Sequence, residues 1–164
     1  MQYQNGRGWR EQITPPLTEM GITVFNPYSK PFVQNSDEDE PVHDQLQQWL
    51  NDGDYDRVAE KMKQIRNFDL RLCDISDFII AQINPKVASW GSAEELVTSI
   101  RMKKPVFLSI EGGKQLTPFW ILGMLPHKYI YNNVDEIINV LKKIDSGEKT
   151  IDSECWRLLR PEFR

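Results

Sequence analysis

The stretch Asp77-Phe78-Ile79-Ile80-Ala81-Gln82-Ile83 decides the fold class. Its continuous apolar run is typical of a strand buried on both faces of a parallel sheet. The chain then passes through the loop Asn84–Trp90 into a helix predicted over Ser92–Met102, where apolar residues recur at helical spacing. A second apolar strand is predicted over Pro105–Ile110. A strand, a helix and a strand in succession indicate an α/β fold with a parallel sheet.

The rest of the chain supplies further elements of the same kind. The clearest are a helix over residues 55–73, a strand over 128–131 and a helix over 134–144. The others are a helix over 9–20 that Pro15 and Pro16 must break or kink, a strand over 22–25, a long loop over 26–53 with a helical turn or two at 43–50, and a short helix over 117–122. We therefore expect one flavodoxin-like domain over residues 1–150, with helices on both faces of its sheet, and a tail over 151–164.

Composition excludes several classes of function. A chain of 164 residues with 40% hydrophobic content suits one well-buried core. Its net charge of −4 gives no basic surface for a nucleic acid polymer, although a small anion remains a possible ligand. No apolar run is long enough for a membrane span, and the start has no signal-peptide stretch. Cys73 and Cys155 show neither metal-ligand spacing nor a disulfide framework. We expect a cytoplasmic protein without a metal or cofactor.

Glu95 is the first candidate for chemistry. In a parallel α/β sheet, ligands bind beyond the carboxyl ends of the strands, and Glu95 falls in the first turn of the predicted helix at that edge. The helix dipole favours its ionised form, and a carboxylate there could attack an anomeric carbon. The alternative is a capping box, because Ser92-Ala93-Glu94-Glu95 fits the pattern S-x-x-E. Spacing alone favours the cap.

Three stretches resemble the core of the nucleoside 2-deoxyribosyltransferase superfamily, which includes the 2′-deoxynucleoside 5′-phosphate N-hydrolases and related CMP hydrolases. The stretches are Asn67-Phe68-Asp69-Leu70, Asp74-Ile75-Ser76-Asp77-Phe78-Ile79-Ile80-Ala81 and Gly91-Ser92-Ala93-Glu94-Glu95-Leu96. They match a D-L pair near the end of a helix, a strand after an acidic turn, and the motif G-x-x-x-E-L. Ala93 replaces the second glycine that is usual in the family. The similarity runs weakly over about residues 6–144.

The resemblance implies roles for four of these residues. Glu95 falls on the nucleophile of the family, and Asp69 falls on the carboxylate that helps protonate the departing base and positions the sugar. Without the resemblance, Asp69 reads as a solvated helix residue. Ser89 is typical of the members that act on 5′-monophosphates, although serine is also a common loop residue. Gly91 is the signature glycine, counted with the substrate-binding residues.

The resemblance also implies a homodimer or a higher homo-oligomer with shared sites. Thr117 matches a position that reaches the site of the neighbouring subunit. Its other interpretation is a helix N-cap in front of Pro118. Both roles can hold for the same residue.

The segment Asn5-Gly6-Arg7-Gly8-Trp9-Arg10 is the last candidate for ligand binding. Its glycines open a predicted helix, so the N–H groups of Gly6, Arg7 and Gly8 could hold a phosphate or a ribose. Arg7 is preferred over Arg10 as the phosphate ligand because it lies in the turn. Trp90 could stack on a base, and a packing role suits it equally well.

One departure from the family concerns the sheet. Family members begin with an apolar strand just before the glycine-rich turn, whereas this chain starts at Met1, immediately after the expected place of that strand. In the family strand order 2-1-3-4-5 the missing strand is central, so strand 77–83 could not pair normally. We expect either a start site placed too late or a sheet rearranged around the gap. An aromatic contact of the family is lost with the strand.

The expected function is N-glycosidic cleavage. The substrate would be a nucleoside 5′-monophosphate, with the 2′-deoxy form favoured, and the reaction would pass through a covalent glycosyl-Glu95 intermediate. Two alternatives stay open. One is a 2′-deoxyribosyltransferase, which passes the same intermediate to a second base. The other is a nucleotide-binding module without turnover.

Overall fold

The computed structural model of the protein describes residues 3–27, 40–152 and 154–163. Its centre is a three-stranded parallel sheet with the order β1-β2-β3, formed by Ile79–Ile83, Val106–Ile110 and Ile130–Tyr131. β1 lies opposite β2 along its whole length, from the pair Ile79 and Val106 to the pair Ile83 and Ile110. Against the expectation that strand 77–83 could not pair normally, it pairs in full with β2, while its other edge has no neighbouring strand among the described residues.

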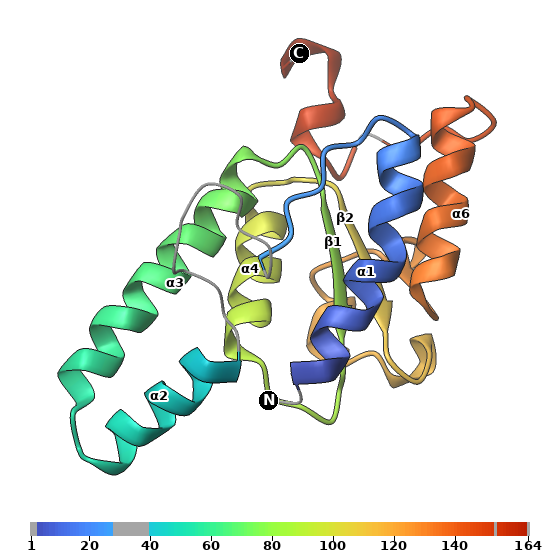
Figure 1. The fold of residues 1–164 in the computed structure, drawn as a ribbon. Helices are drawn as coiled ribbons and strands as arrows, with labels where there is room; N and C mark the ends of the chain where they lie inside the picture. Colours follow the sequence, from blue (N-terminus) through green and yellow to red (C-terminus); the bar gives the residue numbers. More distant parts are fainter. Residues whose placement is uncertain (1–2, 28–39, 153, 164) are drawn as a thin grey trace.

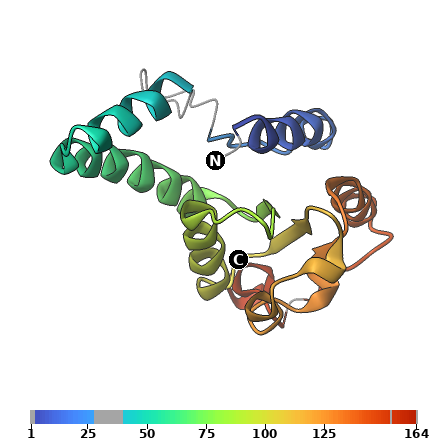
Figure 2. The ribbon, with the colours of Figure 1, turned by 90° about the horizontal axis from the view of Figure 1, so that it is seen from below.

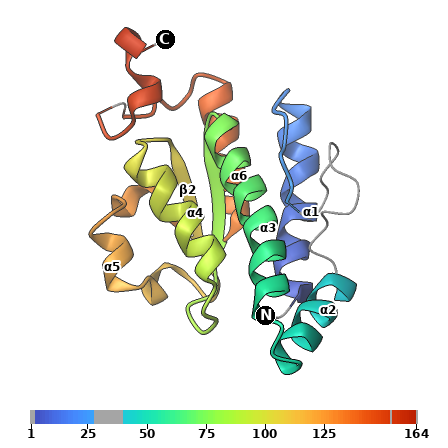
Figure 3. The same ribbon diagram turned by 90° about the vertical axis from the view of Figure 1, so that its left-hand side faces the viewer.

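Helices cover both faces of this sheet (Figures 1 and 2). α3 (Tyr55–Ile75) and α4 (Trp90–Arg101) pack together on one side, and α1 (Tyr3–Glu19) and α6 (Val134–Asp145) pack together on the other. α2 (Glu40–Asn51) lies against α3 (Figure 3). The shorter elements are Lys114–Leu116, α5 (Phe119–Leu122), His127–Tyr129, Arg157–Leu159 and Pro161–Phe163. The predicted flavodoxin-like α/β architecture is confirmed. None of the helices in the described ranges is both long and apolar enough to span a membrane.

β2 forms the centre of the core because it has a strand on each side and helices on both faces. All five of its residues are buried, whereas every residue of β1 is only partly buried. The ring of Phe107 lies between Tyr131, with centroids 6.4 Å apart, and Phe78, with centroids 5.8 Å apart. The sheet is thus fully covered at β2 and β3 and less covered at its β1 edge.

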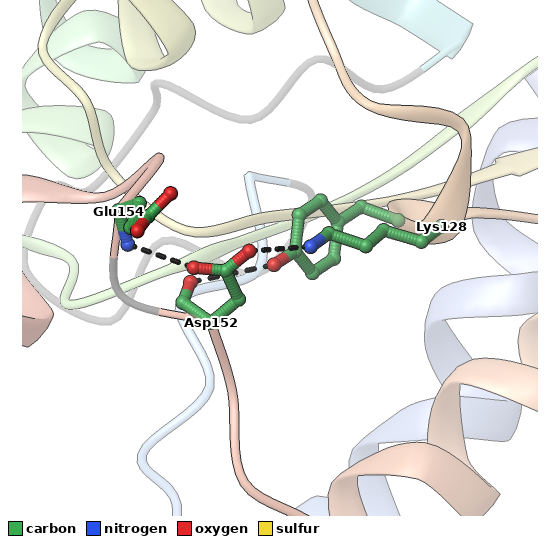
Figure 4. Close-up of polar contacts among 4 residues, drawn as sticks. Lys128, Asp152 and Glu154 are labelled. Carbon is green, nitrogen blue, oxygen red and sulfur yellow. Dashed lines mark hydrogen bonds and ion pairs between the residues drawn. The ribbon is translucent and has the colours of Figure 1, made fainter.

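The segment after α6, which the sequence did not place, packs against this core through Trp156. The indole is 3% exposed, and its centroid lies 3.9 Å from the ring of Tyr129 and 5.8 Å from that of Phe107. Polar contacts hold the chain in place at Asp152, four residues before Trp156 (Figure 4). Lys128 Nζ lies 2.5 Å from Asp152 Oδ2, and the hydroxyl of Tyr129 donates to the carbonyl of Asp152 at 3.4 Å.

α1 differs from its prediction in length and continuity. It begins at Tyr3 instead of residue 9 and continues through Pro15 and Pro16, so the expected break is wrong. The two prolines remove the N–H partners of the carbonyls of Glu11 and Gln12. Both of these residues are exposed, so water can satisfy their carbonyls.

Two further predictions for the first third of the chain are wrong. Residues 22–25 form no strand in the sheet, which among the described residues consists of β1, β2 and β3. The helical turn or two predicted at 43–50 is part of the longer helix α2 over Glu40–Asn51, so the loop predicted around it is wrong there. Pro41 is its second residue, and proline is well tolerated in a first turn because the N–H groups there lack helical partners. The rest of the predicted loop, residues 28–39, lies outside the described residues.

Lys104 connects α3 to the sheet and predicts a measurable loss of stability. Its buried Nζ donates to the carbonyls of Cys73, Asp74 and Ser76 at 2.5, 2.6 and 2.5 Å. Lys104→Met leaves these carbonyls without that donor, so we expect the free energy of unfolding to fall by about 2–4 kcal/mol. Urea unfolding followed by circular dichroism measures it. Lys103→Met, at an exposed neighbour, is the control, and equal losses for both variants would contradict the role of Lys104.

Candidate functional site

A cavity of about 560 Å³ opens between the two helical layers, beside β1. One wall comes from α1 and the segment Gly21–Pro27 that follows it. The opposite wall comes from the last turns of α3 and residues 76–80, which lead into β1, and α4 contributes Glu95. Cavities of roughly 300–1,000 Å³ are typical of small-molecule sites. The volume therefore suits a ligand of the size of a nucleotide.

Asp69 and Glu95 both line this cavity, although they belong to different helices. Each side chain is partly buried, and the Oδ1 atom of Asp69 is fully buried. Cys73 follows Asp69 by four residues on α3, so its thiol lies on the same helix face. Burial, then the charge of Glu95, and to a smaller extent the charge of Asp69 raise the pKa of Cys73 to about 11. The two carboxylates are therefore near enough to act on one buried thiol.

Glu94 and Glu95 are neighbours with different surroundings. Both carboxylate oxygens of Glu94 accept hydrogen bonds from Arg66 on α3, with 2.7 Å between Nε and Oε2. This guanidinium holds the pKa of Glu94 below its ordinary value. The pair is exposed and joins the outer surfaces of α3 and α4, whereas Glu95 lines the cavity. Of the two, Glu95 alone is placed to meet a ligand there.

The start of α4 excludes the capping box. The helix begins at Trp90, with Ser89 at the N-cap position, so Ser92 lies inside the first turn and cannot cap it. The hydroxyl of Ser89 donates to Oγ of Ser92 at 3.0 Å. Glu95 consequently lies in the second turn, not the first as predicted. The helix dipole acts mainly within the first turn, so it supports the ionised form of Glu95 less than expected.

The first half of α1 contributes Trp9 and Arg10 to the cavity. The guanidinium carbon of Arg10 lies 4.3 Å from the centroid of the Trp9 ring, which is a cation–π distance. The sequence favoured Arg7, but that side chain is exposed and does not line the cavity. The predicted glycine-rich turn is also wrong, because Gly6, Arg7 and Gly8 are helical residues of α1. The N–H groups of Arg7 and Gly8 lie beyond the first turn, so helical hydrogen bonds use them.

The remaining predicted binding residues do not line the cavity. Ser89 is partly buried, Trp90 is 86% exposed, and Gly91 has open space around the position of a Cβ. Thr117 is buried, and its hydroxyl donates to the carbonyl of Lys114 at 2.6 Å. The N-cap of α5 is Pro118, so the capping role predicted for Thr117 is wrong. Binding roles for these residues, and a site shared between subunits, stay predictions.

The described residues contain no group of three His, Cys, Asp or Glu side chains arranged to hold a metal ion. Comparison with protein-family models, curated proteins and solved structures finds no match for this chain. The residues that line the cavity are therefore the features of this protein that point to a function.

Cys73 provides a test of this geometry that needs no substrate. Glu95→Gln or Asp69→Asn removes a negative charge that disfavours the thiolate, so we expect the pKa of Cys73 to fall from about 11 toward its ordinary 9.0, more for Glu95→Gln. The ultraviolet absorbance of the thiolate across alkaline pH measures it, with Cys155→Ser as the background. Glu94→Gln should leave the pKa unchanged. An unaltered pKa in both cavity variants would show that the carboxylates are far from the thiol.

Proposed function

We propose that this protein cleaves the N-glycosidic bond of a nucleoside 5′-monophosphate. The observation that carries the proposal is the meeting of Asp69 and Glu95 in one cavity, where both charges act on the thiol of Cys73. Most enzymes that cleave glycosidic bonds use two carboxyl side chains, one on each side of the scissile bond. The cavity has the volume of a small-molecule site, and its lining includes the cation of Arg10.

The proposed reaction uses the two carboxylates in turn. The carboxylate of Glu95 attacks C1′ of the sugar, and the bond between C1′ and the base nitrogen breaks as Asp69 gives its proton to the base. The product is a free base and a glycosyl ester on Glu95. Asp69, now a carboxylate, accepts a proton from a water molecule that attacks C1′ and releases Glu95. Asp69 is then protonated again, and the sugar leaves with a hydroxyl at C1′.

Arg10 and Trp9 provide the binding surface that this substrate needs. A guanidinium forms charge-assisted hydrogen bonds to phosphate oxygens, and an indole ring offers a flat face to a base. In the structure the two side chains stack on each other at the cavity wall. We infer that a nucleotide binds with its phosphate at Arg10 and its glycosidic bond between Asp69 and Glu95.

The direct test is base release from a panel of ribonucleoside and 2′-deoxyribonucleoside 5′-monophosphates and the corresponding free nucleosides, separated by liquid chromatography. The proposal expects release from monophosphates in preference to free nucleosides. A new nucleoside formed after addition of a second free base would establish the transferase alternative instead. Calorimetric binding of a monophosphate without base release from any compound would identify a binding module and overturn the proposal.

A further inference from the structure

The helices α3 and α4 pack side by side and run in the same direction (Figures 1 and 3). Asp69 and Cys73 are four residues apart on α3, and Glu95 and Ser99 are four residues apart on α4. Residues four apart lie one above the other on the same face of a helix. Each carboxylate therefore has a small polar side chain one turn beyond it, toward the C-terminal end of its helix.

Cys73 and Ser99 meet in the interior between the two helices. Cys73 is 7% exposed and Ser99 is fully buried. The hydroxyl of Ser99 has no hydrogen-bond partner of ordinary geometry among the described residues, but it lies close enough to the thiol of Cys73 to lower the pKa of that thiol. Burial, and then the charge of Glu95, raise the pKa of the thiol to about 11 despite this contact, so the thiol is uncharged near neutral pH. Two small uncharged groups thus form the contact between α3 and α4 at this level.

A second contact joins the same helices on the other side of the carboxylates. Arg66 lies one turn before Asp69, and its guanidinium binds Glu94 on α4. This ion pair is accessible to water, which weakens it. The distance between two packed helices depends on the size of the side chains at their contact. The buried contact of Cys73 and Ser99 therefore determines how closely α3 and α4 approach.

We propose that Cys73 and Ser99 are positioning residues, whose small side chains let α3 and α4 approach closely enough for Asp69 and Glu95 to act on one glycosidic bond. This inference rests on the proposed function, in which Glu95 attacks C1′ and Asp69 protonates the base. In glycosidases that form a covalent intermediate the two carboxyl groups are about 5–5.5 Å apart, whereas in those that activate water directly they are about 6.5–9.5 Å apart. The spacing of the two helices thus decides which reaction the carboxylates can perform.

Added bulk at Ser99 tests the proposal. Ser99→Thr keeps the hydroxyl and adds one methyl group at a fully buried position, so it acts as a wedge between the helices. We expect kcat for base release to fall by about 10- to 100-fold, since a displacement of about 1 Å can cost about 10²-fold. KM should change little, because Ser99 does not line the cavity.

The pH profile of kcat distinguishes a change of spacing from a loss of folded protein. Two carboxyl groups that lie close together lose their protons in two separate steps, because each charge disfavours the other. In Ser99→Thr the acidic and alkaline limits of the profile should therefore move closer together. A smaller fraction of folded protein would lower the rate at every pH and leave these limits where they are.

A compensating substitution on α3 provides the rescue. Cys73→Ala removes one heavy atom opposite the added methyl group, so Ser99→Thr with Cys73→Ala has as many side-chain heavy atoms as the parent. We expect this double variant to recover kcat to within a few-fold of Cys73→Ala alone, because packing tolerates changes that conserve volume. Ser146→Thr makes the same chemical change at an exposed residue and is the matched control. If Ser99→Thr does not fold, the double variant must still fold and release base, and failure of this rescue would contradict the proposal.

The thiol of Cys73 gives a second readout that needs no substrate. Glu95→Gln is expected to lower the pKa of Cys73, and in the Ser99→Thr background this decrease should be smaller, because the wedge moves the carboxylate away from the thiol. Either an unchanged decrease or a parental kcat in Ser99→Thr would overturn the proposal. Absence of base release from the parent would instead overturn the proposed function, and the thiol measurement would still show whether Cys73 and Ser99 set the spacing of the helices.

Discussion

Replacing Glu95 by Gln is expected to lower base release from nucleoside 5′-monophosphates by at least about 10³-fold, the scale of loss seen when a nucleophile is removed. The amide keeps the size of the side chain, replaces one acceptor oxygen by an NH2 donor, and is a very poor nucleophile toward C1′. The loss should fall on kcat, since the substituted residue is needed in the chemical step and contributes little to binding. Initial rates of base release across substrate concentrations measure it.

Glu94→Gln is the matched control for this experiment. It makes the same chemical change one residue earlier, where the carboxylate is bound by Arg66 on the surface. An exposed ion pair contributes about 0–1 kcal/mol, so this variant should fold and keep its rate within a few-fold of the parent. If Glu95→Gln retains the rate of the parent, Glu95 is not the nucleophile. A large loss in Glu94→Gln alone would move that role to its neighbour.

Trp156→Ala is expected to reduce the free energy of unfolding by about 3–5 kcal/mol, the usual cost of deleting a large buried aromatic side chain. The indole fills the space against Tyr129 and Phe107, and no other described side chain of the segment after α6 is as deeply buried. Its loss leaves a void beside Tyr129, at the start of β3, and the chain held near it by the ion pair of Lys128 and Asp152 loses its packing contact. Urea unfolding followed by circular dichroism measures the change.

Leu158→Ala separates loss of packing from a general effect of mutating this segment. Its side chain is 38% exposed, so we expect a change below about 1 kcal/mol. Similar losses of unfolding free energy for the two variants would show that the packing of Trp156 does not stabilise this segment in particular. If Trp156→Ala does not fold, Trp156→Phe retains part of the contact and should give an intermediate value.

The sequence predicted the elements that carry their own periodicity. The strand predicted at 77–83 is observed at Ile79–Ile83, and the helix predicted at 134–144 is observed at Val134–Asp145. Both have strong apolar patterns and clear boundaries, such as Asn133, whose side chain accepts a hydrogen bond from Glu136 N. Such elements can be predicted from the sequence because the residues that determine each helix or strand lie within it.

Segments whose structure depends on a distant partner were predicted wrongly or left unplaced. Residues 22–25 have the composition of a strand, but a strand needs a neighbour to pair with, and no local rule supplies one. The segment containing Trp156 shows no pattern of its own, since its place is set by Tyr129 and Phe107. α2 was predicted only in part, as a helical turn or two at 43–50, because Pro41 was taken as a breaker although it occupies a first turn.

Some residues of the candidate site were predicted from the sequence, and others were not. Asp69 and Glu95 were predicted together from motifs, and the structure places both in one cavity. Arg10 was weighed and passed over for Arg7, because Arg7 fell in the predicted glycine-rich turn, and Trp9 was not considered as a binding residue although both it and Arg10 fell in the helix predicted over 9–20. Helical spacing was the signal that could have found them: α1 places Trp9, Ile13 and Leu17 at intervals of four, and all three line the cavity.

The burial of Trp156 has a consequence for spectroscopy. All five tryptophans lie in the described ranges, and Trp156 alone is buried, whereas Trp90 and Trp120 are 86% and 81% exposed. The emission of the native protein is therefore weighted toward indoles that already contact water. Trp156 makes the largest change of environment on denaturation, with a smaller change for the partly buried Trp9 and Trp49, so the wavelength shift reports chiefly on the contact between the last segment and the sheet.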